Sequence, residues 1–92
     1  MFRIELEPTL TSCIETEARK EYAVTLRRLL AGEESHQQLE EKVELLRLFL
    51  ESSDFRQLRA EYEPHLLAGE RVRFTICLEG GAPRYTLEIR TA

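Results

Sequence analysis

The feature that most constrains the fold of this chain is a strict alternation of apolar and polar residues near its C-terminus. Every second residue is apolar from Arg71 to Leu78, and the alternation resumes from Arg84 to Arg90 after the segment Glu79-Gly80-Gly81-Ala82-Pro83. Strand side chains point to opposite faces with a period of two, so this pattern predicts a β-hairpin with one apolar and one polar face. Such a sheet needs cover on one side only.

The N-terminus carries the same alternation over a shorter stretch. Apolar residues at positions 2, 4 and 6, beginning with Phe2, alternate with Arg3 and Glu5 until Pro8 ends the pattern. We therefore predict a third strand over residues 1–6. It can join either edge of the hairpin, and the sequence does not choose between them.

Between these strands the hydrophobic period is helical, and three helices are predicted. Cap patterns open each of them: Ser12 with Glu15, Ser35 with Gln38, and Asp54 with Gln57. Their expected bounds are Pro8 or Ser12 to Gly32, Ser35 to about Glu51, and Asp54 to about Glu63. Pro64 is expected to end or bend the third helix, and residues 64–68 can add one more turn.

These elements predict a single α+β domain over residues 1–92, in the order β-α-α-α-β-β. A chain of 92 residues has the size of one domain. Each helix has one apolar partner available, which is the inner face of the hairpin. We therefore expect two layers, with the helices packed on one face of a small sheet that contains the C-terminal antiparallel hairpin. That inner face is expected to consist of Phe74, Ile76, Leu78, Tyr85, Leu87 and Ile89.

Charge and composition exclude several classes of protein. The net charge of −4 argues against a non-specific binder of nucleic acid or of anionic membranes. No apolar run reaches the roughly 20 residues of a membrane span, and the first residues lack the apolar core of a signal peptide. Cys13 and Cys77 are too few and too far apart for a metal motif. The expectation is a reduced, cytoplasmic protein with no membrane contact.

Residues that could carry catalysis are sparse. His36 and His65 are the only histidines, and Asp54, the only aspartate, is accounted for as a helix cap. Glu15 is the one carboxylate on the apolar side of a helix, where compensation of the helix dipole explains it. No spacing matches a catalytic triad or a zinc or calcium site. We therefore expect no catalytic residue, cofactor or metal, although the sequence alone leaves enzymatic activity open.

The polar face of the sheet is a candidate binding surface. Sheets that bind single-stranded nucleic acid combine positive charge with aromatic residues, and this face has no aromatic residue, which argues against nucleic acid. If Ile76 pairs with Leu87, Arg73 faces Arg90. The mixture of positive and negative residues on this face indicates cross-strand ion pairing, which keeps the exposed sheet in solution. Its candidate surface residues are Arg3, Arg71, Arg73, Arg84, Glu88 and Arg90.

The second predicted helix carries more apolar surface than one sheet face can cover. Leu39, Val43 and Leu46 already form its core arc, and Leu45 and Leu48 extend the apolar surface well beyond it. Either the third helix covers these two leucines or another chain does, because larger exposed apolar patches usually mark interfaces. Leu45 and Leu48 are therefore the candidate interface residues, and a homodimer is one of the two alternatives.

The sequence as a whole favours a small intracellular interaction or regulatory protein without catalysis, which binds a protein partner or itself. One alternative is a nucleic-acid-associated regulator that uses the arginines of the open sheet face. Another is an enzyme or small-ligand binder whose site forms only in three dimensions. A deep pocket lined by His65 or Glu15 would favour that last alternative.

Overall fold

The computed structural model describes residues 3–32 and 36–91. Phe2 of the predicted first strand and the predicted helix cap Ser35 are not among the described residues. The order of elements confirms the predicted β-α-α-α-β-β arrangement of a mixed α+β fold. The elements are β1 (Arg3–Leu6), α1 (Ile14–Ala31), α2 (His36–Ser52), α3 (Phe55–Leu67), β2 (Arg71–Glu79) and β3 (Ala82–Arg90).

The three strands form one antiparallel sheet in the order β1-β2-β3, so the first strand pairs with β2. The predicted hairpin register is wrong by two residues, because Ile76 lies opposite Tyr85 and not Leu87. Gly80 and Gly81 have φ values of 60° and 78°, which a two-residue type I′ turn requires at both positions. The turn is therefore shorter than the five-residue segment 79–83 that interrupts the alternation in the sequence. A shift by two residues keeps every side chain on its predicted face.

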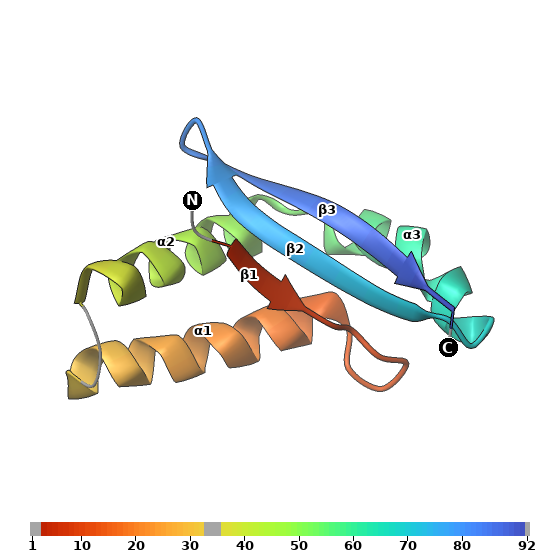
Figure 1. The fold of residues 1–92 in the computed structure, drawn as a ribbon, viewed down its shortest axis with the longest axis horizontal. Helices are drawn as coiled ribbons and strands as arrows, with labels where there is room; N and C mark the ends of the chain where they lie inside the picture. Colours follow the sequence, from red (N-terminus) through yellow and green to blue (C-terminus); the bar gives the residue numbers. More distant parts are fainter. Residues whose placement is uncertain (1–2, 33–35, 92) are drawn as a thin grey trace.

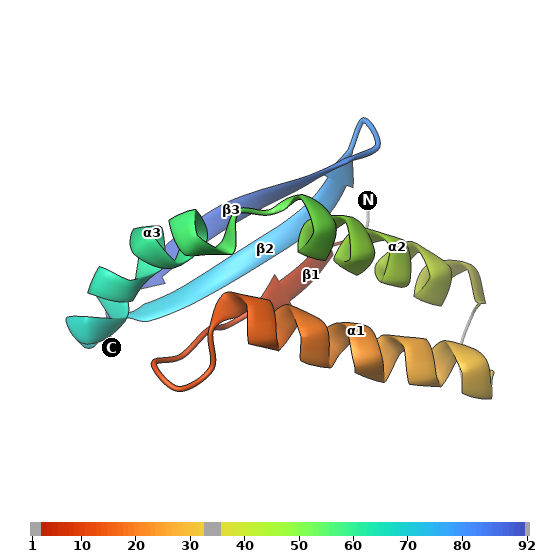
Figure 2. The ribbon, with the colours of Figure 1, turned by 180° about the vertical axis from the view of Figure 1, so that it is seen from behind.

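The three helices lie on one side of the sheet, as Figure 1 and Figure 2 show from opposite directions. Phe74 and Ile76 of the central strand are fully buried against them. The ring of Tyr62 from α3 meets the ring of Phe74 edge to face, with centroids 5.7 Å apart. The Tyr62 hydroxyl also accepts a hydrogen bond from the Ile14 amide at 3.1 Å, which ties α3 to the start of α1.

The described helix ends agree with the predictions except at the start of α1. Gly32, with a φ of 68°, ends α1 as predicted, and the Asp54 carboxylate accepts the Gln57 amide at 3.2 Å. The predicted capping box at Ser12 does not form, because Ser12 donates its hydroxyl hydrogen bond to Glu17. Helix α3 continues through Pro64, so the alternative of one further turn is observed. The Ala68 and Gly69 amides close that turn on the carbonyls of residues 64 and 66.

The far half of α1 extends away from the sheet, next to the start of α2 (Figure 1). Leu30 is 80% exposed there, although the helical period of apolar residues extends to it. Thr25 is fully buried instead, and its hydroxyl is satisfied by the Glu21 carbonyl at 2.7 Å. Helix α1 is longer than the sheet is wide, so its last turns lie beyond the core that it shares with the sheet.

Candidate functional surfaces

The open face of the sheet carries all six charged residues that the alternation assigned to it. The register places Arg3 opposite Cys77, which lies opposite Arg84. Arg71 and Arg90 face one another at the other end of the hairpin. The helices leave this face uncovered, and Arg84 and Arg90 are exposed. The face is therefore accessible to a partner along its whole length.

Arg73 at the centre of this face is surrounded by carboxylates. It lies opposite Glu88, and not opposite Arg90 as predicted, because the tight turn shifts the register. Its guanidinium nitrogens lie 3.8–4.0 Å from carboxylate oxygens of Glu5, Glu7 and Glu88. These acidic groups offset the positive charge at the middle of the face. Such a surface lacks the continuous positive charge that a nucleic-acid backbone requires.

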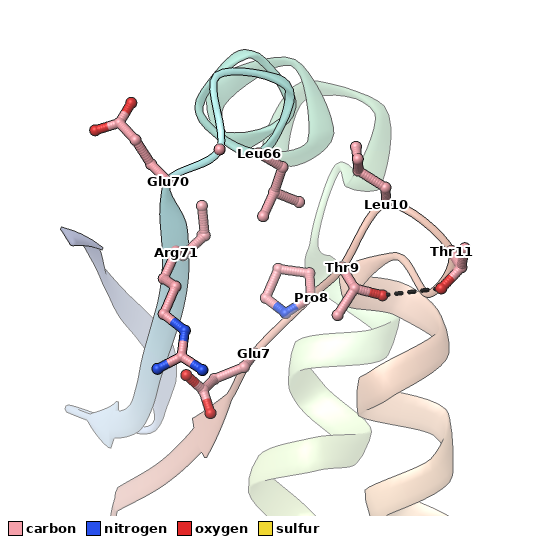
Figure 3. A pocket seen from close by; sticks show the side chains of 10 residues that line it. Glu7, Pro8, Thr9, Leu10, Thr11, Leu66, Glu70 and Arg71 are labelled. Atoms are coloured by element: carbon pink, nitrogen blue, oxygen red, sulfur yellow. Dashed lines mark hydrogen bonds between the residues drawn. The ribbon is translucent and has the colours of Figure 1, made fainter. Parts of the chain in front are cut away.

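A groove of about 510 Å³ separates the β1–α1 loop from the corner between α3 and β2 (Figure 3). Pro8 and Leu66 face each other across it, and Val72 also lines it. Glu7 and Arg71 lie at one side, whereas Glu70 points away. His65 does not line this groove, and its Nδ1 lies 3.0 Å from a carboxylate oxygen of Glu70. The groove offers apolar contact but no nucleophile beside a base.

A second groove, of about 400 Å³, lies between the start of α1 and α3 and contains Cys13 and Glu15. The Cys13 sulfur lies 3.2 Å from the Thr16 hydroxyl. This hydrogen bond is the largest cause that lowers the pKa of the Cys13 thiol, followed by the amides of the first helical turn. The amides in question are those of Thr16 and Glu15, and partial burial of the thiol opposes their effect.

Sequence reasoning missed the environment of Cys13. The signal available was a cysteine just before a helix start with a threonine three residues later. Glu15, the carboxylate singled out in the sequence, is ion-paired with Arg19 at 2.7 Å and its side chain is 38% exposed. It is therefore not a buried carboxyl group, and the groove beside it is open to solvent.

The inner face of β3 is only partly covered by the helices. Tyr85 is 41% exposed, and Leu87 and Ile89 are half-buried at the border of the core. The Tyr85 hydroxyl donates a hydrogen bond to Glu61 of α3 at 3.0 Å. Partial burial, followed by this hydrogen bond, raises the pKa of Tyr85. An accessible apolar row remains at the edge of the sheet.

The two leucines proposed as an interface have different positions. Leu45 is 1% exposed and belongs to the core, so this chain itself covers it. Its assignment to an interface with another chain is therefore corrected. Leu48 is half-buried, one helical turn from the C-terminal end of α2. The helical period alone could not assign Leu45 to the core or to an interface. The packing of α2 against both α1 and the sheet decides which side of the helix is covered.

The model of one protein family matches residues 2–83, almost the whole chain. This chain belongs to that family. The function of the family is unknown. No curated protein and no solved structure matches the chain. The family match extends from the N-terminus through all three helices and β2, and it ends at Pro83 within β3.

Two further properties of the described residues concern metal binding and membrane spanning. Within residues 3–32 and 36–91, no three histidine, cysteine, aspartate or glutamate side chains are grouped so that they could hold a metal ion. None of the helices described has the length and apolar character needed to span a bilayer.

Proposed function

We propose that this chain is a small, non-catalytic, cytoplasmic interaction protein that associates with itself. The observation that carries this proposal is the apolar row of Tyr85, Leu87 and Ile89, which faces the helical layer but stays partly accessible. Accessible apolar surface at the edge of a small domain is typical of an interaction site. Two-fold dimers are the commonest way in which such a surface is buried.

The other features support interaction more than catalysis. The two grooves described above are open, and neither places a histidine beside a nucleophile. Cys13 has the chemistry of a reactive thiol, but its contacts are a hydroxyl and helix amides and not a general base. Both cysteines are free thiols, which supports a reducing compartment such as the cytoplasm.

Self-association is tested by sedimentation velocity between about 1 and 200 micromolar protein, a range that brackets weak and moderate dimers. The expected result is a reversible, concentration-dependent increase from the mass of one chain to that of two. A single species with the mass of one chain at about 200 micromolar would contradict the proposal.

The nucleic-acid alternative is tested with the same protein. Fluorescence anisotropy with mixed-sequence oligonucleotides is expected to show no binding at physiological salt, because carboxylates surround Arg73. Binding in the micromolar range that weakens steeply with added salt would favour the nucleic-acid-associated regulator instead.

A further inference from the structure

β3 is one of the two edge strands of the sheet, and its free edge presents backbone groups. Glu79 and Ala82 flank the two-residue turn and are partners in the register, which makes them a hydrogen-bonded pair. Hydrogen-bonded pairs alternate along an antiparallel ladder, so the amides of Tyr85, Leu87 and Ile89 point away from β2. Pro83 lies in the same outward phase, and its missing N–H therefore removes no bond to β2.

The three residues with outward backbone groups are also the accessible apolar row on the inner face. Tyr85 is 41% exposed, and its two neighbours in this row are half-buried. A strand added to this edge would satisfy their amides and carbonyls and cover their side chains at the same time. The unpaired edge and the incomplete apolar cover thus point to the same kind of partner.

We propose that two copies of this chain pair their β3 strands antiparallel about a two-fold axis at Thr86, forming a continuous six-stranded sheet. This inference rests on the proposed self-association and assigns its surface. Thr86 is the midpoint of Ala82–Arg90, so this register overlaps the two strands along their whole length. Tyr85 of each copy then lies beside Leu87 of the other, on the face that the helices line.

Charge favours this register over one with the axis at Leu87. With Thr86 at the axis, Arg84 of each copy lies opposite Glu88 of the other, so the dimer contains this ion pair twice. Arg84 makes no hydrogen bond or ion pair among the described residues, whereas Glu88 lies 3.2 Å from Arg90. An axis at Leu87 would instead place Arg84 opposite Arg90, and like charges in direct opposition are destabilising.

The first test changes the residue on the axis. Thr86→Lys places two ammonium groups opposite each other in the dimer, although Thr86 is exposed in the single chain. We expect its dimer dissociation constant to rise by about tenfold or more, measured by sedimentation equilibrium. Thr91→Lys is the matched control, because it adds the same charge after the end of β3. Its dissociation constant should stay within about threefold of the wild-type value.

The second test exploits the predicted ion pair. Arg84→Glu and Glu88→Arg should each weaken self-association, because each places like charges opposite one another twice. In an equimolar mixture each new charge meets its opposite, so a heterodimer should form with near wild-type affinity. Both variants stay net negative, so overall charge cannot cause this rescue. Circular dichroism checks that each variant is folded, since Glu88→Arg adds positive charge near Arg73 and Arg90.

The outcomes separate this inference from the proposed function. A wild-type protein that stays a single chain at all concentrations contradicts both. A wild-type dimer that Thr86→Lys and Thr91→Lys affect equally contradicts the β3 interface alone and locates self-association elsewhere. If Glu88→Arg does not fold, the two lysine variants still decide whether the β3 edge is used. Absence of heterodimer from two folded variants contradicts the register.

Discussion

At the scale of single residues, Cys13 is the side chain with the most distinctive chemistry. It occupies the position before the first residue of α1, where partial positive charge from free amides favours an anion. The Thr16 hydroxyl, 3.2 Å from the sulfur, adds a hydrogen bond that stabilises the thiolate. The Thr16 hydroxyl makes the largest contribution to the lowered pKa of Cys13, so this pKa depends on one side chain as well as on the helix.

We predict that Cys13 is alkylated at lower pH than an ordinary thiol. In a Cys77→Ser background the iodoacetamide rate should have its pH midpoint below 9.0, the ordinary pKa of this thiol. Thr16→Ala should move the midpoint up, whereas Thr86→Ala, far from the sulfur, should not. Equal midpoints for the protein and a free thiol would contradict the prediction.

The same shift gives the sign of a pH effect on stability. The Cys13 pKa is lower in the folded chain than in the unfolded chain, so unfolding takes up a proton between the two values. The contribution of Cys13 to the free energy of unfolding is therefore present above the unfolded pKa. It is lost as the pH falls through the folded value.

At the scale of elements, β2 organises the molecule because it is the central strand and packs against the helices. Its inward residues Val72, Phe74 and Ile76 are at most 2% exposed. Its outward neighbour Thr75 is half-buried on the open face, between Glu5 and Thr86 of the flanking strands. Substitutions on the two faces of this strand should therefore differ widely in their effect on stability.

We predict that Phe74→Ala lowers the free energy of unfolding by about 3–5 kcal/mol, because it leaves a cavity in the core. Thr75→Ala should lower it by less than about 1 kcal/mol. Urea melts followed by circular dichroism measure both values. The reverse order would mean that the faces of β2 are assigned wrongly.

At the scale of the whole molecule, the helical layer covers the inner face of the sheet unevenly. It buries the inner residues of β1 and β2 but covers those of β3 only in part. Leu48 of α2 is also half-buried, so it remains a second apolar position that another chain could contact. A dimer interface on β3 and one at Leu48 predict different oligomeric states for a Leu48 variant.

If the β3 edges pair, Leu48→Glu should remain a dimer in sedimentation velocity. The melting temperature of both proteins should also rise with concentration, by up to about 3 °C for each tenfold increase, because association stabilises the folded chain. A folded, single-chain Leu48→Glu protein would place the interface on α2 instead. In that case the Thr86→Lys variant should dimerise normally.

The sequence by itself determined the order of the elements, the faces of the strands, the end of α1 at Gly32 and the start of α3 at Asp54. These features depend on the period of apolar residues and on hydrogen bonds between near neighbours, which a single stretch of sequence contains. The glycine pair Gly80-Gly81 was also present in the sequence, but the alternation alone did not place the turn, and the predicted register was two residues away from the observed one. Pro83 is tolerated because its missing N–H faces the free edge of the sheet.

Only the tertiary structure decided which edge β1 joins, that Leu45 is buried, and that Cys13 lies in a groove beside α3. It also decided that Tyr85 and its neighbours on β3 stay partly accessible. Each of these facts depends on which parts of one element another element contacts and covers. Residues distant in the chain make these contacts, so no local pattern specifies them.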